Sequence, residues 1–484
     1  MSENYSEGEL SDCRNLSSAQ APSISQRFGR AVEAEYSAPK ALHTKEGLLI
    51  VNGTELIYNG KKIGDVSDTR KQIVTVGKYI IIYPDKLFYD TDSGEFGSMD
   101  ITYTSAAKKA VFTNNSVTVA GAKWKFRVGD AVDISGCTSL PYNNKNIICR
   151  GVDGDTLTFY DNSFKEGTEA SAVSFKRVAP DLDFICENNY RLWGAKGDTI
   201  YSSKYNDPFN FQVFDGLSGD SYNIYIGTDG EWTGCVPYSS HVCFFKENVL
   251  HKIYGDKPSN FQVVTSQVYG VQAGSERSIC TVNETVLYKG VGGIYAYTGG
   301  IPELISGAFG TERFSDACAT SDGERYYISM RNGDQWGLYV YDLLKGVWLK
   351  EDECQCVDMA FYDGDVYFLR ADGQLLKTGL EIEESDIEWS ATFCPFNETM
   401  NERKGYSKFH LRLELGAKSW LNVEIKRDTD TRWKKVYTTH NERHRTVSIP
   451  VMPARCDSVE IRLSGKGECK IRGFIREFFT GSDV

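Results

Sequence analysis

Apolar and polar positions along the middle of the chain follow one recurring pattern. A turn containing Gly, Asp or Asn precedes an apolar strand, a second turn and a strand rich in Tyr. This pattern predicts short antiparallel strands joined by hairpins. The segments that carry it begin at Asp68, Asp181, Glu231, Arg277, Asp316 and Cys356.

The spacing of these segments indicates the fold class. Most of their starts lie about 40–50 residues apart, a period typical of propeller blades. We therefore predict an all-β protein containing a six- or seven-bladed β-propeller, in which blades surround a central channel. The interval after Asp68 is far longer than the others, which indicates an insertion between two blades.

The N-terminal part of the chain differs from the repeats. Residues 1–45 have few apolar positions and no period. They predict an extended arm that becomes ordered only against a neighbour, with a disordered tail as the alternative for the first dozen residues. Residues 46–97 are predicted to form the first blades. The strand-turn-strand pattern from Gly47 is a candidate for the segment that closes the ring.

Two further modules are predicted. Residues 98–178 interrupt the period, and the Gly129-Asp130 turn before alternating Val132 and Ile134 predicts a small inserted β-barrel. Such a module would contact another subunit, or it is a decorative insertion. Residues 179–384 are predicted to form the remaining blades.

Residues 385–484 alternate polarity in a way that predicts a β-sandwich with one buried and one solvated face on each sheet. In the strand around HLRLEL, one face is polar and the other apolar. The polar face carries His410, Arg412 and Glu414, and the apolar face carries Leu411, Leu413 and Leu415.

Charge is distributed unevenly along the 484 residues, whose net charge is -12. Residues 385–484 contain 18 basic and 14 acidic side chains, whereas the rest contains 36 basic and 52 acidic ones. An acidic body is unsuited to tight nucleic-acid wrapping, which needs phosphate neutralisation. It is compatible with a channel wall that repels passing DNA.

The cysteines and the apolar runs limit the cellular setting. Thirteen cysteines occur without a CxxC pair, and Cys354 and Cys356 are the nearest approach. Two thiolates alone do not make a zinc site, so we interpret most cysteines as buried free thiols of a protein made in a reducing cytoplasm. The polar start is no signal peptide, and no run, including that from Ile73, is long enough to span a bilayer.

The sequence offers no catalytic, cofactor-binding or metal-binding residues that we would assign, and we predict that the protein is not an enzyme and needs no cofactor. Zinc-protease, nucleophile-elbow and phosphate-loop motifs are absent. Asp90 and Asp92 resemble the start of a calcium loop, but a strand-capping turn explains them better. The Asp-Gly turns near Thr228 and Ser321 are ordinary hairpin signals. A solvated loop best explains the polar stretch with His440 and His444.

Several phrases resemble a known family. The phrase DTIYSSKYNDPFNF spans Asp198–Phe211, and KPSNFQVV begins at Lys257. The arm contains CRNL from Cys13 and SQRFGR from Ser25. Together these phrases resemble the packaged-DNA stabilisation and tail nozzle (tail tubular hub) proteins of short-tailed bacteriophages. The resemblance covers most of the chain through pattern rather than dense identity.

The resemblance implies a structural virion protein of the phage tail, assembled in the host cytoplasm. Such proteins form a ring, here expected to be a homo-hexamer, below the portal and adaptor proteins of the head-tail connector. The ring extends the DNA channel, retains packaged double-stranded DNA and conducts it at ejection. Other tail proteins, such as a spike, fibre or needle, would dock on it. The resemblance carries over no catalytic residues.

Two alternatives remain at this point. A receptor- or carbohydrate-binding tail propeller would have a concave aromatic site around Trp232, Trp336 or Trp348. A glycoside hydrolase would need two carboxylates in one pocket, and the sequence does not single out a pair.

Overall fold

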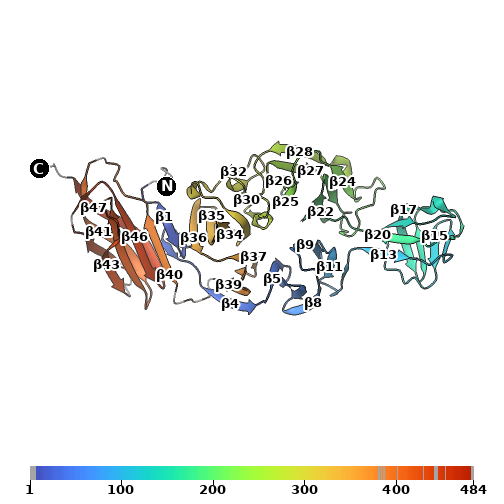
Figure 1. The fold of residues 1–484 in the computed structure, drawn as a ribbon, viewed down its shortest axis with the longest axis horizontal. Coiled ribbons are helices and arrows are strands. Elements are labelled where there is room, and N and C mark those ends of the chain that lie inside the picture. Colours follow the sequence, from blue (N-terminus) through green and yellow to red (C-terminus); the bar gives the residue numbers. More distant parts are fainter. Residues whose placement is uncertain are drawn as a thin grey trace. The chain divides into compact units, whose positions relative to one another are not determined.

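The computed structural model describes residues 7–379, 382, 384, 387–400, 402–428, 430–440, 445–452 and 454–480. This part of the chain consists mainly of antiparallel β-strands (Figure 1). Four short 3₁₀ turns occur at Pro141–Asn143, Pro258–Asn260, Glu276–Ser278 and Gly307–Phe309. The chain divides into two compact units. The sandwich unit comprises residues 1–44, 277–298 and 303–484, and the barrel unit comprises residues 45–276 and 299–302.

The barrel unit contains three complete four-stranded antiparallel sheets. The first is β9 (Gln72–Val76), β10 (Tyr79–Tyr83), β11 (Leu87–Asp90) and β12 (Phe96–Ser98). The second is β21 (Phe184–Asn188), β22 (Arg191–Lys196), β23 (Thr199–Ser202) and β24 (Tyr222–Tyr225). The third is β25 (Trp232–Tyr238), β26 (His241–Lys246), β27 (Val249–Tyr254) and β28 (Gln262–Gln267). The unit also holds β6 (Leu48–Asn52), β7 (Glu55–Tyr58) and β8 (Lys61–Asp65).

The second strands of these sheets are apolar on both faces because each sheet packs between neighbours. In β10, Ile81 is buried with Leu192 of β22 in one cluster. In the next cluster, Trp193 of β22 packs with Trp232 and Phe244 of the following sheet. Fully burying a large apolar side chain stabilises the fold by about 1.5–3 kcal/mol. Continuous runs such as YIIIY therefore mark strands that are covered on both sides.

The sandwich unit contains three more sheets of this kind. The first is β29 (Cys280–Val282), β30 (Thr285–Gly290), β31 (Gly293–Tyr297) and β32 (Glu303–Leu304). The second is β33 (Ser315–Ser321), β34 (Arg325–Asn332), β35 (Gln335–Asp342) and β36 (Val347–Asp352). The third is β37 (Cys356–Tyr362), β38 (Asp365–Arg370), β39 (Gln374–Thr378) and, from the N-terminal arm, β4 (Arg30–Glu35).

With the sheet β5 (Pro39–Thr44) to β8, the described residues form seven four-stranded sheets. The fold is a β-propeller, as predicted, and this number of sheets is within the predicted six or seven blades. One detail of the prediction is wrong. The segment from Gly47 forms β6–β8 of the first blade, whereas the last blade is completed by β4, which pairs with β39 (Figure 1). The arm was assigned no strands because its residues show no period.

An eight-stranded sheet curls into the inserted barrel between β12 and β21. Its core is apolar and includes Phe112, Val132, Ile134, Phe159 and Phe175. The alternation seen at Val132 and Ile134 therefore points into the barrel. The strands are β13 (Ile101–Thr104), β14 (Ala110–Thr113), β15 (Ser116–Val119), β16 (Ala131–Ser135), β17 (Lys145–Asp153), β18 (Thr156–Phe159), β19 (Gly167–Thr168) and β20 (Ser174–Arg177).

The C-terminal module is a sandwich of two sheets around one apolar core. In β41, Leu411, Leu413 and Leu415 are buried and Arg412 is exposed, as the alternation predicts. The strands from this part of the chain are β40 (Glu388–Phe393), β41 (Lys404–Leu415), β42 (Trp420–Arg427), β43 (Lys434–His440), β44 (Arg445–Pro450), β45 (Arg455–Cys456), β46 (Val459–Lys466) and β47 (Cys469–Thr480).

The described part of the arm, from Glu7 onward, is ordered within its own chain, which corrects the prediction that the arm needs a neighbour. β1 (Leu10–Arg14) pairs with β40 and adds an edge strand to one sheet of the sandwich (Figure 1). β2 (Leu16–Ser17) and β3 (Ile24–Gln26) extend the other sheet beside β47. Leu16 is fully buried in the sandwich core. The arm reaches its partners over more than 300 residues of sequence, which no local pattern reveals.

Candidate functional site

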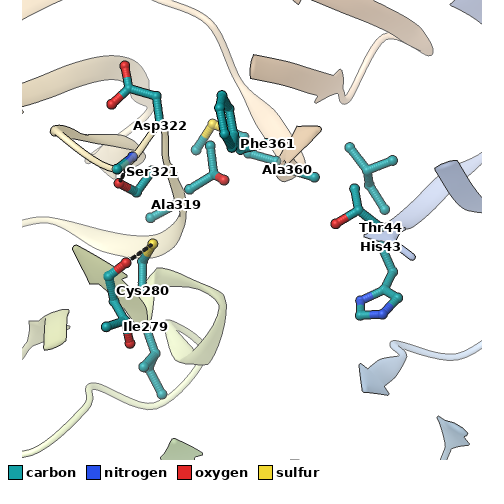
Figure 2. Close-up of a pocket in the computed structure, with 14 residues that line it drawn as sticks. His43, Thr44, Ile279, Cys280, Ala319, Ser321, Asp322, Ala360 and Phe361 are labelled. Atoms are coloured by element: carbon teal, nitrogen blue, oxygen red, sulfur yellow. Dashed lines mark hydrogen bonds between the residues drawn. The ribbon is translucent and has the colours of Figure 1, made fainter. Parts of the chain in front are cut away.

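A cavity of about 500 Å³ opens among the first strands of the blades in the sandwich unit (Figure 2). Its wall comes from β5, β29, β33 and β37 and from the turn after β33. The first strand of a blade is the one that faces the central channel of a propeller. Residues of the wall include His43, Thr44, Ile279, Cys280, Ala319, Ser321, Asp322, Ala360 and Phe361.

Asp322 is the carboxylate of this cavity, and it is occupied in holding its turn. Its Oδ1 accepts hydrogen bonds from the backbone N–H groups of Glu324 and Arg325 at 3.0 and 2.7 Å. Its Oδ2 accepts from the Tyr327 hydroxyl and forms an ion pair of 2.7 Å with the Arg325 guanidinium. These contacts use most of the acceptor capacity of the carboxylate, so Asp322 caps the β33–β34 hairpin.

The other polar groups of the wall are neutral at pH 7. Burial lowers the pKa of His43 to about 4, which keeps the imidazole uncharged. Burial likewise raises the pKa of Cys280 to about 12, and its thiol stays protonated. The residues that line the cavity include no Lys or Arg. Besides Asp322, the wall therefore presents hydroxyls, a thiol and a neutral ring.

The residues considered as a calcium loop form a turn. The Asp90 Oδ1 accepts hydrogen bonds from the backbone N–H groups of Asp92 and Ser93 at 2.9 and 3.2 Å. Its Oδ2 forms an ion pair of 2.7 Å with Lys78. Asp90 therefore caps the end of β11, as the sequence favoured. In the part of the chain that the structure describes, no group of three or more His, Cys, Asp or Glu could hold a metal ion.

The tryptophans considered for a carbohydrate site lie in the blade sheets. Trp232 is buried, and its Nε1 donates to the carbonyl of Gly197 at 2.5 Å. Trp348 donates to the carbonyl of Ile305 at 2.8 Å and packs on Tyr341. These two rings therefore contribute to packing rather than to an open platform. Trp336 is half-buried in β35.

His440 ends β43 opposite Trp420, and its side chain is exposed. His444 lies outside the described residues. A helix long and apolar enough to cross a membrane is not found among the described residues.

The phrase that carries the family resemblance forms a buried polar cluster in the barrel unit, which we call the barrel joint (Asp130, Arg177, Asp207 and Asn210). The Asn210 side-chain amide donates to Asp130 at 3.1 Å and to Asp207 at 2.5 Å. Its Oδ1 accepts from the backbone N–H of Ala131 at 3.1 Å. Asp130 forms an ion pair of 2.6 Å with Arg177, and both side chains are almost fully buried.

The joint connects three parts of the barrel unit. Asp130 and Arg177 belong to the inserted barrel, and Asn210 belongs to the loop between β23 and β24. Phe209 of the same loop packs edge-on against Tyr79 and Phe88 of the preceding blade, with ring centroids 4.9 and 5.0 Å apart. The Arg177 guanidinium lies 5.3 Å from the Phe209 ring centroid. The NDPFNF phrase therefore fixes the barrel to two adjacent blades.

Burial raises the pKa of the Asp207 carboxyl, although the Asn210 amide opposes this effect. The cluster thus holds two carboxyl groups. Asp130 is strongly paired, whereas burial disfavours the ionised form of Asp207. Such an arrangement is stable only when each polar group keeps its partner. The joint is consequently a positioning device whose members depend on one another.

Two parts of the barrel joint are recognisable in the sequence, but their contact is not. The Gly129-Asp130 turn and the NDPFNF phrase were both singled out, for the barrel and for the family resemblance respectively. Arg177 was missed, because a basic residue at the end of a strand has no distinctive local signal. The one indication in the sequence was that Arg177 lies immediately before the residues that resume the propeller period.

Comparisons with known proteins identify no family for the chain. No family model matches the chain, and no curated protein matches it. Among solved structures, BamB from Moraxella catarrhalis is similar at 10% identity and a TM-score of 0.38, covering 74% of this chain and 99% of that one. The N-terminal domain of Nup159 is similar at 10% identity and a TM-score of 0.27, covering 73% and 94%.

An exo-beta-1,3-galactanase from Phanerochaete chrysosporium is similar at 9% identity and a TM-score of 0.23, covering 58% of this chain and 92% of that one. Likeness at this level carries no argument about activity.

Proposed function

We propose that this chain is a structural subunit of a phage tail that forms a nozzle or hub ring around the path of double-stranded DNA. The observation that carries the proposal is the barrel joint. The segment that resembles the tail nozzle family holds the inserted barrel rigidly against two adjacent blades. Such a contact is expected of a structural subunit. Buried polar contacts of this kind fix a geometry more than they add stability.

In this proposal six copies assemble below the portal and adaptor proteins. The DNA path runs between the copies, retains the packaged genome and conducts it at ejection. Each basic contact to phosphate adds affinity and therefore friction. The excess of acidic residues before position 385 supports a surface that does not grip DNA.

The basic C-terminal module supports a docking role. Its polar positions carry the excess of Lys and Arg on solvated strand faces, as Arg412 in β41 illustrates. Opposite charge between partners speeds encounter and sets orientation more than it adds affinity. An acidic neighbour, such as an adjacent protomer or a connector protein, would be a suitable partner.

The experiment that tests the proposal is mass measurement and negative-stain imaging of the purified full-length protein, alone and mixed with the portal and adaptor of its own phage. We expect a six-fold ring, or six copies recruited by the connector. A protein that stays monomeric under both conditions and is missing from purified virions would contradict the proposal. The Gln212→Ala variant, which changes an exposed side chain beside the barrel joint, should assemble like the unchanged protein.

A second candidate function is carbohydrate binding, and one observation favours it. A groove of about 270 Å³ in the barrel unit has two exposed aromatic rings, Tyr160 and Phe214, beside Asp161 and Asp215. Aromatic faces with nearby carboxylates are suited to sugar rings. Glycan-array binding that is lost in Phe214→Ala, with a monomeric protein, would favour this function over the nozzle.

A further inference from the structure

Two neighbouring thiols lie in the link between β36 and β37. The Sγ atoms of Cys354 and Cys356 are 3.6 Å apart, and both residues are buried. The Ser329 side chain fixes the backbone at both cysteines. The Ser329 hydroxyl donates to the Cys354 carbonyl at 2.8 Å and accepts from the Cys356 N–H at 3.2 Å. The approach of the two sulfurs therefore follows from a fixed backbone.

A buried cation stands beside this pair. Arg30 of β4 has a side chain that is 6% exposed, and it forms ion pairs of 2.5 and 2.6 Å with Glu351 and Asp352. Its Nε is buried and has no hydrogen-bond partner in the structure. The hydrogen bond from the Cys356 thiol lowers the pKa of Cys354 and the Arg30 charge lowers it further, against the opposing effect of burial. Cys354 is thus the better nucleophile of the two.

We propose that Cys354 and Cys356 form an oxidisable dithiol site that reacts with a small peroxide and closes to an intrachain disulfide. The Cys354 thiolate attacks one oxygen of hydrogen peroxide, the O–O bond breaks, and a sulfenic acid and water form once a proton is taken up. The Cys356 thiol then attacks the Cys354 sulfur and expels a second water. Overall, two thiols and one peroxide give one disulfide and two waters, and two electrons pass from sulfur to oxygen.

The burial of the site selects the oxidant. Cys354 is 7% exposed and Cys356 is 4% exposed, so a bulky disulfide such as oxidised glutathione cannot reach either sulfur in the folded protein. Peroxide is close to water in size. The closed disulfide would lock the start of β37, the first strand of the last blade. This inference does not depend on the tail function proposed above.

The chain contains a matched internal control. In the barrel unit, burial raises the pKa of Cys186, and its interaction with Cys235 raises that pKa further. No Lys or Arg is among the causes of that shift. Among these four cysteines, Cys235 is the most exposed to solvent. Access alone would therefore favour the control pair, whereas the cation favours Cys354.

The test is hydrogen peroxide treatment of the folded full-length protein, followed by unfolding, alkylation of the remaining thiols and peptide mass spectrometry. We expect the Cys354–Cys356 peptide to lose two hydrogens about tenfold faster than the control pair becomes linked. Faster oxidation of Cys186 and Cys235, or failure of Cys354 and Cys356 to link, would overturn the proposal.

The Cys356→Ser variant separates the two chemical steps. Its hydroxyl is of similar size but cannot form a disulfide, so Cys354 should stop at the sulfenic acid and be labelled by dimedone that is present while the oxidised protein is unfolded. The matched variant Cys235→Ser should leave the Cys354–Cys356 linkage unchanged. An unlabelled Cys354 in the Cys356→Ser variant, oxidised while folded and unfolded in dimedone, would show that Cys354 is not the attacking thiol and would reject the proposed mechanism.

Discussion

Glu169 shows how one buried carboxylate organises a loop of the inserted barrel. It is fully buried and accepts hydrogen bonds from the backbone N–H groups of Thr138, Ser139, Leu140 and Ser171. The hydroxyls of Thr138 and Ser171 also donate to it. Burial alone would raise the pKa of this carboxyl, but the hydrogen bonds, led by that of the Ser139 N–H, hold it well below the usual range.

The Glu169→Gln substitution should destabilise the barrel by about 3 kcal/mol, because an amide nitrogen would face donors that need an acceptor. The pH dependence has a definite sign. The pKa is lowered on folding, so the stabilisation is present above about pH 4.5 and is lost as the pH falls below it. Urea unfolding of both proteins as a function of pH measures this. Exposed Glu166→Gln is the control and should change stability little.

His251 should make folding sensitive to mild acid. It is fully buried, and its two ring nitrogens lie 3.0 and 2.9 Å from the hydroxyls of Thr228 and Thr265. Burial lowers its pKa to about 4, and the nearby Lys246 contributes. Because the folded pKa lies below the unfolded value of about 6.5, stability is full above pH 6.5 and falls as the pH drops toward 4.

His251→Gln should reduce the slope of unfolding free energy against pH by about one proton in that window. Equal slopes in the His251→Gln variant and the unchanged protein would contradict the assignment.

At the scale of elements, the barrel joint decides how firmly the insertion is held. Asn210→Ala removes two donors and one acceptor from a buried cluster and leaves Asp130 with fewer partners. We expect a loss of about 2–3 kcal/mol, together with faster amide hydrogen exchange in β16 and β20, which carry Asp130's neighbour Ala131 and Arg177. Gln212→Ala, on the same loop, is the control. Unchanged exchange in Asn210→Ala would show that the apolar contacts of Phe209 suffice.

At the scale of the whole molecule, the N-terminal arm makes the sandwich a composite of the two chain ends. β1 covers the edge of β40, and β2–β3 cover the edge of β47. Residues 387–480 expressed alone should therefore fold poorly and aggregate, because two edges and the site of Leu16 are left open. A fusion that places residues 7–28 before this fragment through a flexible linker should restore a cooperative thermal transition. A monomeric, cooperatively folding fragment without the arm would contradict this view.

The burial of the cysteines agrees with the interpretation that most of them are buried thiols. Eleven of the thirteen cysteines are buried. The pair at Cys354 and Cys356 lies beside the buried guanidinium of Arg30, which is more than 300 residues away in the sequence. The spacing of the two cysteines was visible in the sequence, but the cation that gives the pair its chemistry was not.

The sequence by itself determined the features that follow from neighbouring residues. Strand alternation in β41, the hairpin turns at Asp90 and Asp322, and the propeller period all rest on side-chain direction and turn chemistry, which act over a few positions. Only the tertiary structure decided which strand closes the last blade, which edges the arm covers, and that Asp130, Arg177 and Asn210 meet. These contacts join residues that lie from 47 to more than 300 positions apart in the sequence. Their stability comes from burial and mutual hydrogen bonding, which leave no local pattern.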